Sequence, residues 1–385
     1  FLSLPRISVA TEQSVMAGTP PQRQSQVTFG NYRDRPFNHW DFRNAGAPLN
    51  VVMIPREGQI AQFPVSIDPS IAAFRSTDLH GRELAFDALF EQNFADGVLV
   101  VRGDTVLHES YFGDFDEHQQ HIWFSMTKSL VSAAFGILVA EEKVDLGASP
   151  AAYIPELKGS GFERVTIQHV LDHATGIDFK ENYTDTSSEF FQHYAPALNM
   201  AWLPGAADAQ PTTADIYGVH DFLAKFIKSD SSLQPGEAFD YNSSNADVLG
   251  WLIARISGEP LQDFLQRTIW RKLGAEHDGY IAVDRAFMPV ATGGMNSTLR
   301  DAARFGMMIR DDGRFGGEQV IPAAWAEAIV DVDACLRSTM SSNAKYADDP
   351  WIAYHNMWWI LDDEAGEFCA VGIHGQVIYI NRQAN

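Results

Sequence analysis

Apolar residues recur at helical spacing in the stretch HIWFSMTKSLVSAAFGILVAEE, residues 121–142. From Met126 to Leu138 apolar side chains return every three to four positions, which is the spacing of one face of a helix. The pattern predicts an apolar helix that begins beside Ser125.

Strand patterns lie towards both ends of the chain. The stretch GVLVVRGDTVLHESYFG, residues 97–113, predicts two strands around a Gly103-Asp104 turn. Just before it, LAFDALFEQNF, residues 84–94, predicts a short amphipathic helix. Near the end of the chain, HNMWWILDD and CAVGIHGQVIYIN indicate further strands.

Helical patterns fill the middle of the chain. Residues 150–285 hold helical segments separated by Pro and Gly, among them VTIQHVLDHATG, IYGVHDFLAKFI and SNADVLGWLIARISG. After them, GGMNSTLRDAARFGMMIRDDG predicts a loop that enters a helix. The order predicts an α+β fold: an antiparallel sheet formed by N- and C-terminal segments, flanked by helices, with a helical subdomain inserted.

The same order predicts how the chain is divided. Residues 1–80 are rich in Pro, Gln, Arg and Gly and have weak periodicity, so we expect an irregular N-terminal arm. Residues 81–150 and 286–385 are expected to form the sheet subdomain, and residues 151–285 the mostly helical one. We expect the active site at the interface of these two subdomains.

Composition narrows the kinds of partner. The chain has 385 residues, of which 45% are hydrophobic, so it can bury a large core. Its 50 acidic and 28 basic residues give a net charge of -22, which repels phosphate backbones and anionic lipid. We therefore expect a small-molecule substrate and no nucleic acid; whether the protein forms a homodimer stays open.

The sequence gives few indications of the cellular compartment and none of a membrane span. No apolar run reaches the ~20 residues of a membrane span, and the start FLSLPRISVATEQ lacks the features of a signal peptide. Cys335 and Cys369 are too few for a disulfide framework. The localisation is unknown: a cytoplasmic location is favoured over a periplasmic one, and neither is decided.

Several common chemistries lack their motifs. The chain has no G-x-S-x-G elbow, no Walker A loop and no G-x-G-x-x-G after a strand. His169 and His173 have helical ligand spacing, but a turn follows His173 at once and the Glu of H-E-x-x-H is missing. His118 and His121 stand among acidic residues, as on a solvated loop. We predict no metal and no cofactor.

Ser125 and Lys128 form an S-x-x-K pair where the apolar helix begins. At a helix start, the helix dipole and the free N–H groups favour an anion. The three-residue step puts the lysine amine on the same helix face as the serine hydroxyl. Burial would lower the pKa of the lysine. Alternatively, Ser125 caps the helix and Lys128 reaches solvent. A second S-x-x-K, Ser342 with Lys345, lies in a polar stretch and is expected to be accidental.

A tyrosine supplies the third candidate. Tyr241 in PGEAFDYNSSNADVLGWLI lies in a loop just before an amphipathic helix, with small polar neighbours. Beside Lys128, its phenolate would act as a general base although a free tyrosine has a pKa of about 10. The alternative is a tyrosine packed in the core.

These motifs together resemble the serine β-lactamase-like hydrolases of the class C type. The family includes D-alanyl-D-alanine carboxypeptidases, family VIII carboxylesterases and 6-aminohexanoate-dimer hydrolases. Besides Ser-x-x-Lys and Tyr-Asn-Ser, the stretches VTIQHVLDHATGID, QPGEAFDYNSSNADVLGWLIARISG and GGMNSTLRDAARFG are similar to family segments in the right order. The resemblance covers roughly residues 80–380 and implies an acyl-enzyme on Ser125, with catalytic residues Ser125, Lys128 and Tyr241.

The branch of the family is indicated by what replaces its K-T-G motif. Ala370-Val371-Gly372 stands at that place, so no cation is present to hold the carboxylate of a β-lactam or a D-Ala-D-Ala tail. The runs G-I-H-G-Q, residues 372–376, and KENYTDTSSEF, residues 180–190, instead look like 6-aminohexanoate-dimer hydrolase. We therefore expect a serine hydrolase of short esters or amides. The alternatives are a β-lactamase or D-alanyl-D-alanine carboxypeptidase, and a non-catalytic protein of the penicillin-binding fold.

The resemblance also implies roles for residues around the nucleophile. It places an oxyanion hole at the backbone N–H groups of Ser125 and Ile373, and Tyr183 over the scissile amide nitrogen. Ser243 and His374, in the matched motifs, are further substrate-binding candidates. In the implied mechanism Tyr241, polarised by Lys128, takes the proton of Ser125.

Tyr194 and Thr292 differ from the residues that 6-aminohexanoate-dimer hydrolase has at these positions, and two tryptophans are candidates for the pocket wall. Tyr194 replaces an aspartate near the substrate amine and Thr292 replaces a pocket asparagine, which favours esters over oligo-amides. One of Trp358 and Trp359 is expected to wall the acyl pocket and the other to lie in the core. Family members continue past the G-I-H-G-Q strand into another strand and a C-terminal helix. We therefore expect either residues beyond Asn385, which is the favoured interpretation, or a sheet that is finished differently.

Overall fold

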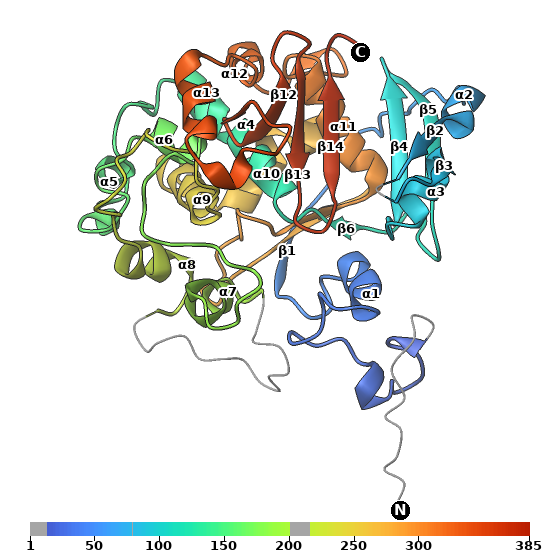
Figure 1. Ribbon diagram of the computed structural model, residues 1–385, viewed down its shortest axis with the longest axis horizontal. Coiled ribbons are helices and arrows are strands. Elements are labelled where there is room, and N and C mark those ends of the chain that lie inside the picture. Colours follow the sequence, from blue (N-terminus) through green and yellow to red (C-terminus); the bar gives the residue numbers. More distant parts are fainter. Residues whose placement is uncertain (1–13, 79, 201–215) are drawn as a thin grey trace, which may run out of the picture.

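The computed structural model describes residues 14–78, 80–200 and 216–385 and combines helices with antiparallel sheets (Figure 1). The α-helices are α1 (Phe37–Arg43), α2 (Pro69–Ala73), α3 (Phe86–Glu91), α4 (Met126–Ala140), α5 (Pro150–Tyr153), α6 (Ile167–Leu171), α7 (Ala195–Leu198), α8 (Val219–Asp221), α9 (Ser244–Ser257), α10 (Leu261–Thr268), α11 (Leu299–Arg310), α12 (Ala323–Ala328) and α13 (Ala334–Ser341). The 3₁₀-helices are η2 (Arg23–Ser25), η3 (Pro155–Leu157), η6 (Trp270–Lys272) and η7 (Ala344–Tyr346), and the π-helices are η4 (Phe190–Tyr194) and η5 (Phe222–Phe226). No helix among these residues is long and apolar enough to cross a membrane.

The strands of the described residues are mostly short. They are β1 (Val51–Ile54), β2 (Arg75–Thr77), β3 (Glu83–Ala85), β4 (Gly97–Arg102), β5 (Thr105–Tyr111), β6 (His121–Ile122), β7 (Gly279–Ala282), β8 (Met295–Ser297), β9 (Arg314–Phe315), β10 (Glu318–Gln319), β11 (Ala353–His355), β12 (Trp358–Asp362), β13 (Glu367–Val371) and β14 (Val377–Asn381). Antiparallel pairing joins them, which confirms the predicted α+β class.

Strands from both ends of the chain lie over one helix. The four-stranded sheet β11-β12-β13-β14 and the hairpin β4–β5 each form their own ladder, and α11 contacts both β14 and β4. Figure 1 shows the two as neighbouring upright layers. The β4–β5 hairpin turns at Gly103 with φ +59°, as predicted from the sequence.

The run CAVGIHGQVIYIN forms two strands and not one. Its centre is a tight turn, in which Gly372 N–H donates to the Gln376 carbonyl at 2.7 Å and Gly375 has φ +95°. Glycine adopts such a left-handed backbone without steric cost. The turn therefore puts Ile373 and His374 at the end of β13, next to the start of α4.

A second sheet fixes the chain just before α4. Its strand order is β1-β7-β8-β6, and Ile122 of β6 pairs with Asn296 of β8. None of these four strands was predicted from the sequence: β1 lies in the segment expected to be irregular, β7 in the segment expected to be helical, β8 in the segment expected to be a loop, and β6 just before the predicted helix. All four are two to four residues long, and they persist because long-range partners satisfy their backbone groups.

Helix α4 is buried on nearly its whole surface. It contacts α9 on one side and β13 and α12 on others, and Gly136 lies so close to Trp325 that a Cβ there would be 2.2 Å from the indole ring. Ser129 and Ser132 donate to the carbonyls of Met357 and Asn356, at 2.8 and 2.7 Å. These bonds lock α4 onto the turn between β11 and β12.

The segment expected to be helical holds α5 to α10, and strand β7 lies near its end. Two helices there contain wide turns: Phe190–Tyr194 and Phe222–Phe226 are π-helical, a feature that apolar periodicity does not reveal. The proposed division into an arm, a sheet subdomain and a helical subdomain remains a prediction.

Candidate active site

The nucleophile candidate lies at a strained corner between β6 and α4. Trp123 N–H donates to the Met295 carbonyl at 2.8 Å and its indole N–H to Ser297 Oγ at 2.8 Å. The next residue, Phe124, has φ +44°, a conformation that non-glycine residues adopt only when their surroundings hold them. The corner turns the chain so that Ser125 becomes the N-terminal cap of α4.

Lys128 reaches back to this serine from the first turn of α4. Its side chain is 1% exposed, and Nζ donates to Ser125 Oγ at 2.9 Å and to the Thr292 carbonyl at 2.8 Å. Burial lowers the pKa of Lys128 to about 8, while the carboxylates of Glu181 and Asp247 act in the opposite direction. The structure therefore excludes the alternative in which the lysine extends into solvent.

Tyr241 faces the same pair from the loop before α9. Its ring centroid is 5.1 Å from Lys128 Nζ, and the ring stacks on Trp359 at 5.5 Å and 14°. Burial raises the pKa of Tyr241, although a hydrogen bond with Ser125 lowers it. The structure thus brings together the three side chains that the sequence singled out, and Trp359, not the buried Trp358, is the tryptophan that contacts Tyr241.

The expected oxyanion donors lie near each other. Gly372 lies so close to residue 123 that a Cβ there would be 2.7 Å from the Trp123 carbonyl, which places the following residue, Ile373, beside the corner. Among the residues that the structure describes, the N–H groups of Ser125 and Ile373 donate no hydrogen bond. Free backbone donors are what an oxyanion hole requires.

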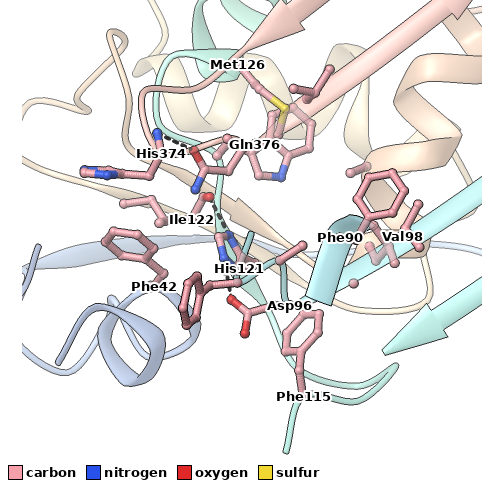
Figure 2. Close-up of a pocket in the computed structure, with 18 of the residues that line it drawn as sticks. Phe42, Phe90, Asp96, Val98, Phe115, His121, Ile122, Met126, His374 and Gln376 are labelled. Carbon is pink, nitrogen blue, oxygen red and sulfur yellow. Dashed lines mark hydrogen bonds and ion pairs between the residues drawn. The ribbon is translucent and has the colours of Figure 1, made fainter. Parts of the chain in front are cut away.

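The substrate-binding candidates are distributed over two places. Tyr183 donates to Glu181 Oε2 at 2.6 Å, and Ser243 N–H donates to Glu181 Oε1 at 2.7 Å, so both lie on the Lys128–Tyr241 side. His374 instead contacts Phe42 and Phe124, with ring centroids 4.9 and 5.2 Å away. It lines a cavity of about 500 Å³ in Figure 2, and burial together with the Arg33 charge lowers its pKa to about 4.

Two carboxylates of the site were missed from the sequence. Glu181 holds Tyr183 and the Ser243 backbone, and Asp247, 3% exposed on α9, accepts a hydrogen bond from Tyr194. Glu181 is one acid in a polar loop, and Asp247 is one polar position within an apolar helix. The only sequence signal was that each lies inside a stretch already matched to the family, Glu181 in KENYTDTSSEF and Asp247 in QPGEAFDYNSSNADVLGWLIARISG.

The other candidate motifs have separate structural roles. His169 accepts from the Thr166 N–H in a capping box, and His173 accepts from the Asn242 N–H at 3.0 Å. His121 pairs with Asp96, and Ser342 donates to the Ser338 carbonyl within its own helix end. In residues 14–78, 80–200 and 216–385, no group of three or more His, Cys, Asp or Glu side chains could hold a metal ion.

Comparison with known proteins identifies the class. The family model for Beta-lactamase matches residues 86–385, so the chain belongs to the β-lactamase family, and its fold is the β-lactamase/transpeptidase fold that the sequence predicted. Within that family the chain is a serine hydrolase.

Individual relatives narrow the class further. The chain is 31% identical to 6-aminohexanoate-dimer hydrolase of Paenarthrobacter ureafaciens over 362 residues, which cover 94% of this chain and 87% of the relative. It is 25% identical to Esterase EstB of Burkholderia gladioli over 242 residues, 57% of this chain and 56% of the esterase. The solved structure of a Bacillus anthracis protein assigned as a 6-aminohexanoate-dimer hydrolase superposes with a TM-score of 0.81 and 26% identity, covering 93% of this chain and 89% of that one.

Proposed function

We propose that this serine hydrolase cleaves short esters or amides through an acyl-enzyme on Ser125. One observation carries the proposal: the buried amine of Lys128 lies 2.9 Å from the Ser125 hydroxyl, and burial lowers its pKa to about 8. A lysine in this condition has a substantial neutral fraction near physiological pH, so it can accept a proton.

The first step is attack on the substrate carbonyl. Neutral Lys128 accepts the hydroxyl proton while Ser125 Oγ bonds to the carbonyl carbon. The sequence led us to expect Tyr241 as the base, but burial raises its pKa, so its hydroxyl keeps its proton. The N–H groups of Ser125 and Ile373 hold the oxyanion, and losing one such donor typically costs about 3 kcal/mol in the transition state.

The second step breaks the bond to the leaving group. The Tyr241 hydroxyl donates its proton to the departing alcohol or amine and regains a proton from the Lys128 ammonium. Water then attacks the acyl-enzyme, with its proton passing to Lys128 in the same way as that of Ser125. As the acyl bond breaks, Ser125 Oγ takes a proton from the Lys128 ammonium, so the hydroxyl and the neutral amine are restored and the carboxylic acid product leaves.

Short esters are the favoured substrate class. The names of two relatives support hydrolysis of an amide dimer and of esters. However, residue 194, where the amide hydrolase has an aspartate near the substrate amine, is a fully buried tyrosine. Esters also have the better leaving group, so they need less help from Tyr241. β-Lactams are disfavoured because Ala370-Val371-Gly372 carries no cation.

A fluorophosphonate probe followed by intact mass tests the nucleophile. We expect one adduct on the wild type, no adduct on Ser125→Ala, and an unchanged adduct on Ser342→Ala, which removes the serine of the second S-x-x-K. An unlabelled wild type would refute the proposal. An adduct that persists in Ser125→Ala would show that another serine is the nucleophile.

A substrate panel tests the specificity. We expect kcat/KM to be highest for p-nitrophenyl acetate and butyrate, lower for the linear dimer of 6-aminohexanoate, and lowest for a chromogenic cephalosporin. Faster turnover of the cephalosporin than of the esters would move the protein to the β-lactamase branch. Faster turnover of the dimer would show that Tyr194 does not impair amide substrates.

A further inference from the structure

Asp247 lies behind the catalytic lysine, inside a family-like stretch, but none of the roles predicted from the sequence falls on it. Its side chain is 3% exposed in the first turn of α9. One carboxylate oxygen accepts from the Tyr194 hydroxyl at 2.5 Å, and the other accepts from the Thr292 N–H at 3.1 Å. The carbonyl of Thr292 in turn accepts from Lys128 Nζ at 2.8 Å.

These bonds form one continuous chain. It runs from Tyr194 in η4 through Asp247 in α9 and Thr292, which precedes β8, to Lys128 in α4. Every group in it is buried, so none can exchange its partner for water at no cost. The position of the lysine amine therefore depends on where residue 292 is held.

We propose that Asp247 is a positioning residue for Lys128: its carboxylate fixes residue 292, whose carbonyl binds the amine, and its negative charge favours the ammonium form. The inference rests on the proposed function, because it concerns the base of that reaction. It also gives Tyr194 a role. Where the resemblance expects an aspartate near the substrate, this chain has a hydroxyl that holds a carboxylate on α9.

Hydrogen-bond geometry alone does not explain an acid at this place. An asparagine has the same shape, can accept from the Thr292 N–H, and can donate to the tyrosine oxygen. What the aspartate adds is charge: burial raises the pKa of Asp247 to about 7 against the opposing effects of the Tyr194 bond and the Lys128 charge, so the carboxylate is ionised in the range where Lys128 titrates. A buried carboxylate is costly unless it is paired, and Lys128 is the nearby cation that acts on it.

Among the described residues, three other titratable groups act on Asp247 or Lys128 or are acted on by them: Glu181, His173 and Asp284. Glu181 acts on Lys128 from the loop before Tyr183, and Lys128 acts on His173, whose pKa burial keeps low. Asp284, after β7, acts on Asp247, and its own carboxylate is held by the N–H groups of Val219, Ala286 and Met288. A change at Asp247 alone leaves all of these in place.

The test is the pH profile of fluorophosphonate inactivation for Asp247→Asn. The base must be neutral to act, so the rate constant rises as pH rises through the pKa of Lys128. Removing a nearby negative charge destabilises the ammonium and lowers that pKa. We expect the rising limb to move to lower pH by about one unit, with little change in the plateau, because an asparagine can still accept from the Thr292 N–H.

A second variant and a control separate this role from a structural one. Tyr194→Phe removes the donor that favours the ionised carboxylate, so the limb should move in the same direction by a smaller amount. Asp301→Asn removes a carboxylate that is equally buried, at 1% exposure, and pairs with Arg304 in α11. It should lower the melting temperature but leave the limb where it is.

The outcomes are distinct. A folded Asp247→Asn whose limb coincides with the wild type, or moves to higher pH, overturns the inference while the proposed function stands. If the wild type takes no label, the proposed function fails, and ¹³C NMR titration of ε-labelled lysine still reads the pKa of Lys128 directly. In that titration, an unchanged Lys128 pKa in Asp247→Asn would also overturn the inference.

Discussion

Lys128 is enclosed by groups that act on its charge in opposite directions. Burial favours the neutral amine, whereas Glu181 and Asp247 favour the ammonium. An ammonium that deep would be unstable without such carboxylates, and an amine without burial would stay protonated at neutral pH. The balance leaves the residue able to exchange a proton near neutral pH, which is what the mechanism proposed for Ser125 needs.

Replacing this lysine should remove the reactivity of the serine. Lys128→Met keeps the length and apolar stem of the side chain but cannot accept a proton. We expect the fluorophosphonate rate constant to fall by a factor of about 100 or more. The matched control is Lys345→Met at the exposed second S-x-x-K, which should leave the rate unchanged. Equal rates for wild type and Lys128→Met would show that the amine is not the base.

Tyr241 provides a test of which group is the base. If its hydroxyl delivers a proton to the leaving group, Tyr241→Phe should matter little when the leaving group needs no proton. We expect a drop of less than about tenfold with p-nitrophenyl esters and of about 100-fold or more with alkyl esters. If both substrates lose activity equally, Tyr241 would be the base for attack, as the sequence first suggested.

At the scale of elements, α4 is fixed from several sides. Its serines bind the β11–β12 turn, and Gly136 allows Trp325 of α12 to lie against the helix backbone. Packing this close gives the helix one position relative to the sheet. The proposed nucleophile at its start is thereby positioned by contacts that extend along the whole helix.

Gly136→Ala should therefore lower the free energy of unfolding and leave the rate of fluorophosphonate labelling unchanged. The added methyl would lie 2.2 Å from the Trp325 ring, so the indole or the helix must shift, at a cost of about 1–3 kcal/mol. Gly147→Ala is the control, since its nearest neighbour would be at 3.4 Å. Urea denaturation should show the loss for position 136 alone, with the labelling rate of folded protein unchanged. An equally stable Gly136→Ala would mean that the α4–α12 contact is looser than the structure has it.

Local patterns were sufficient for the elements with a strong period or turn. The helix after Ser125, the hairpin at Gly103 and the helix after Tyr241 were predictable because periodicity and turn residues lie within a few positions. Strands β1, β6, β7 and β8 were not, because short strands depend on distant partners. Glu181 and Asp247 were not predicted for the same reason: they belong to the site only because Lys128 approaches them from another helix.

At the scale of the whole molecule, a charged cluster joins the N-terminal segment to the body. Asp96, just before β4, accepts hydrogen bonds from His121 of β6 at 3.2 Å and from His39 of α1 at 3.3 Å, and Arg43 of α1 lies 3.8 Å away. Figure 2 shows Asp96 and His121 at the wall of the cavity. Helix α1 and strand β6 thus both bind one carboxylate, which stands just before β4.

The stability contributed by this cluster should depend on pH in a defined direction. Burial raises the pKa of Asp96, but the bonds from His121 and His39 outweigh it, so the pKa lies well below 3.8. A carboxyl whose folded pKa is depressed stabilises the protein above its unfolded pKa, and this contribution is lost as pH falls through the folded value.

We expect Asp96→Asn to lower the unfolding free energy at pH 7 by about 1–3 kcal/mol. The gap to the wild type should close progressively below pH 3.8. Urea denaturation from pH 7 down to pH 3 measures it, with Asp104→Asn on the exposed β4–β5 turn as the control. A gap of constant size across that range would mean that Asp96 contributes through shape and not through its charge.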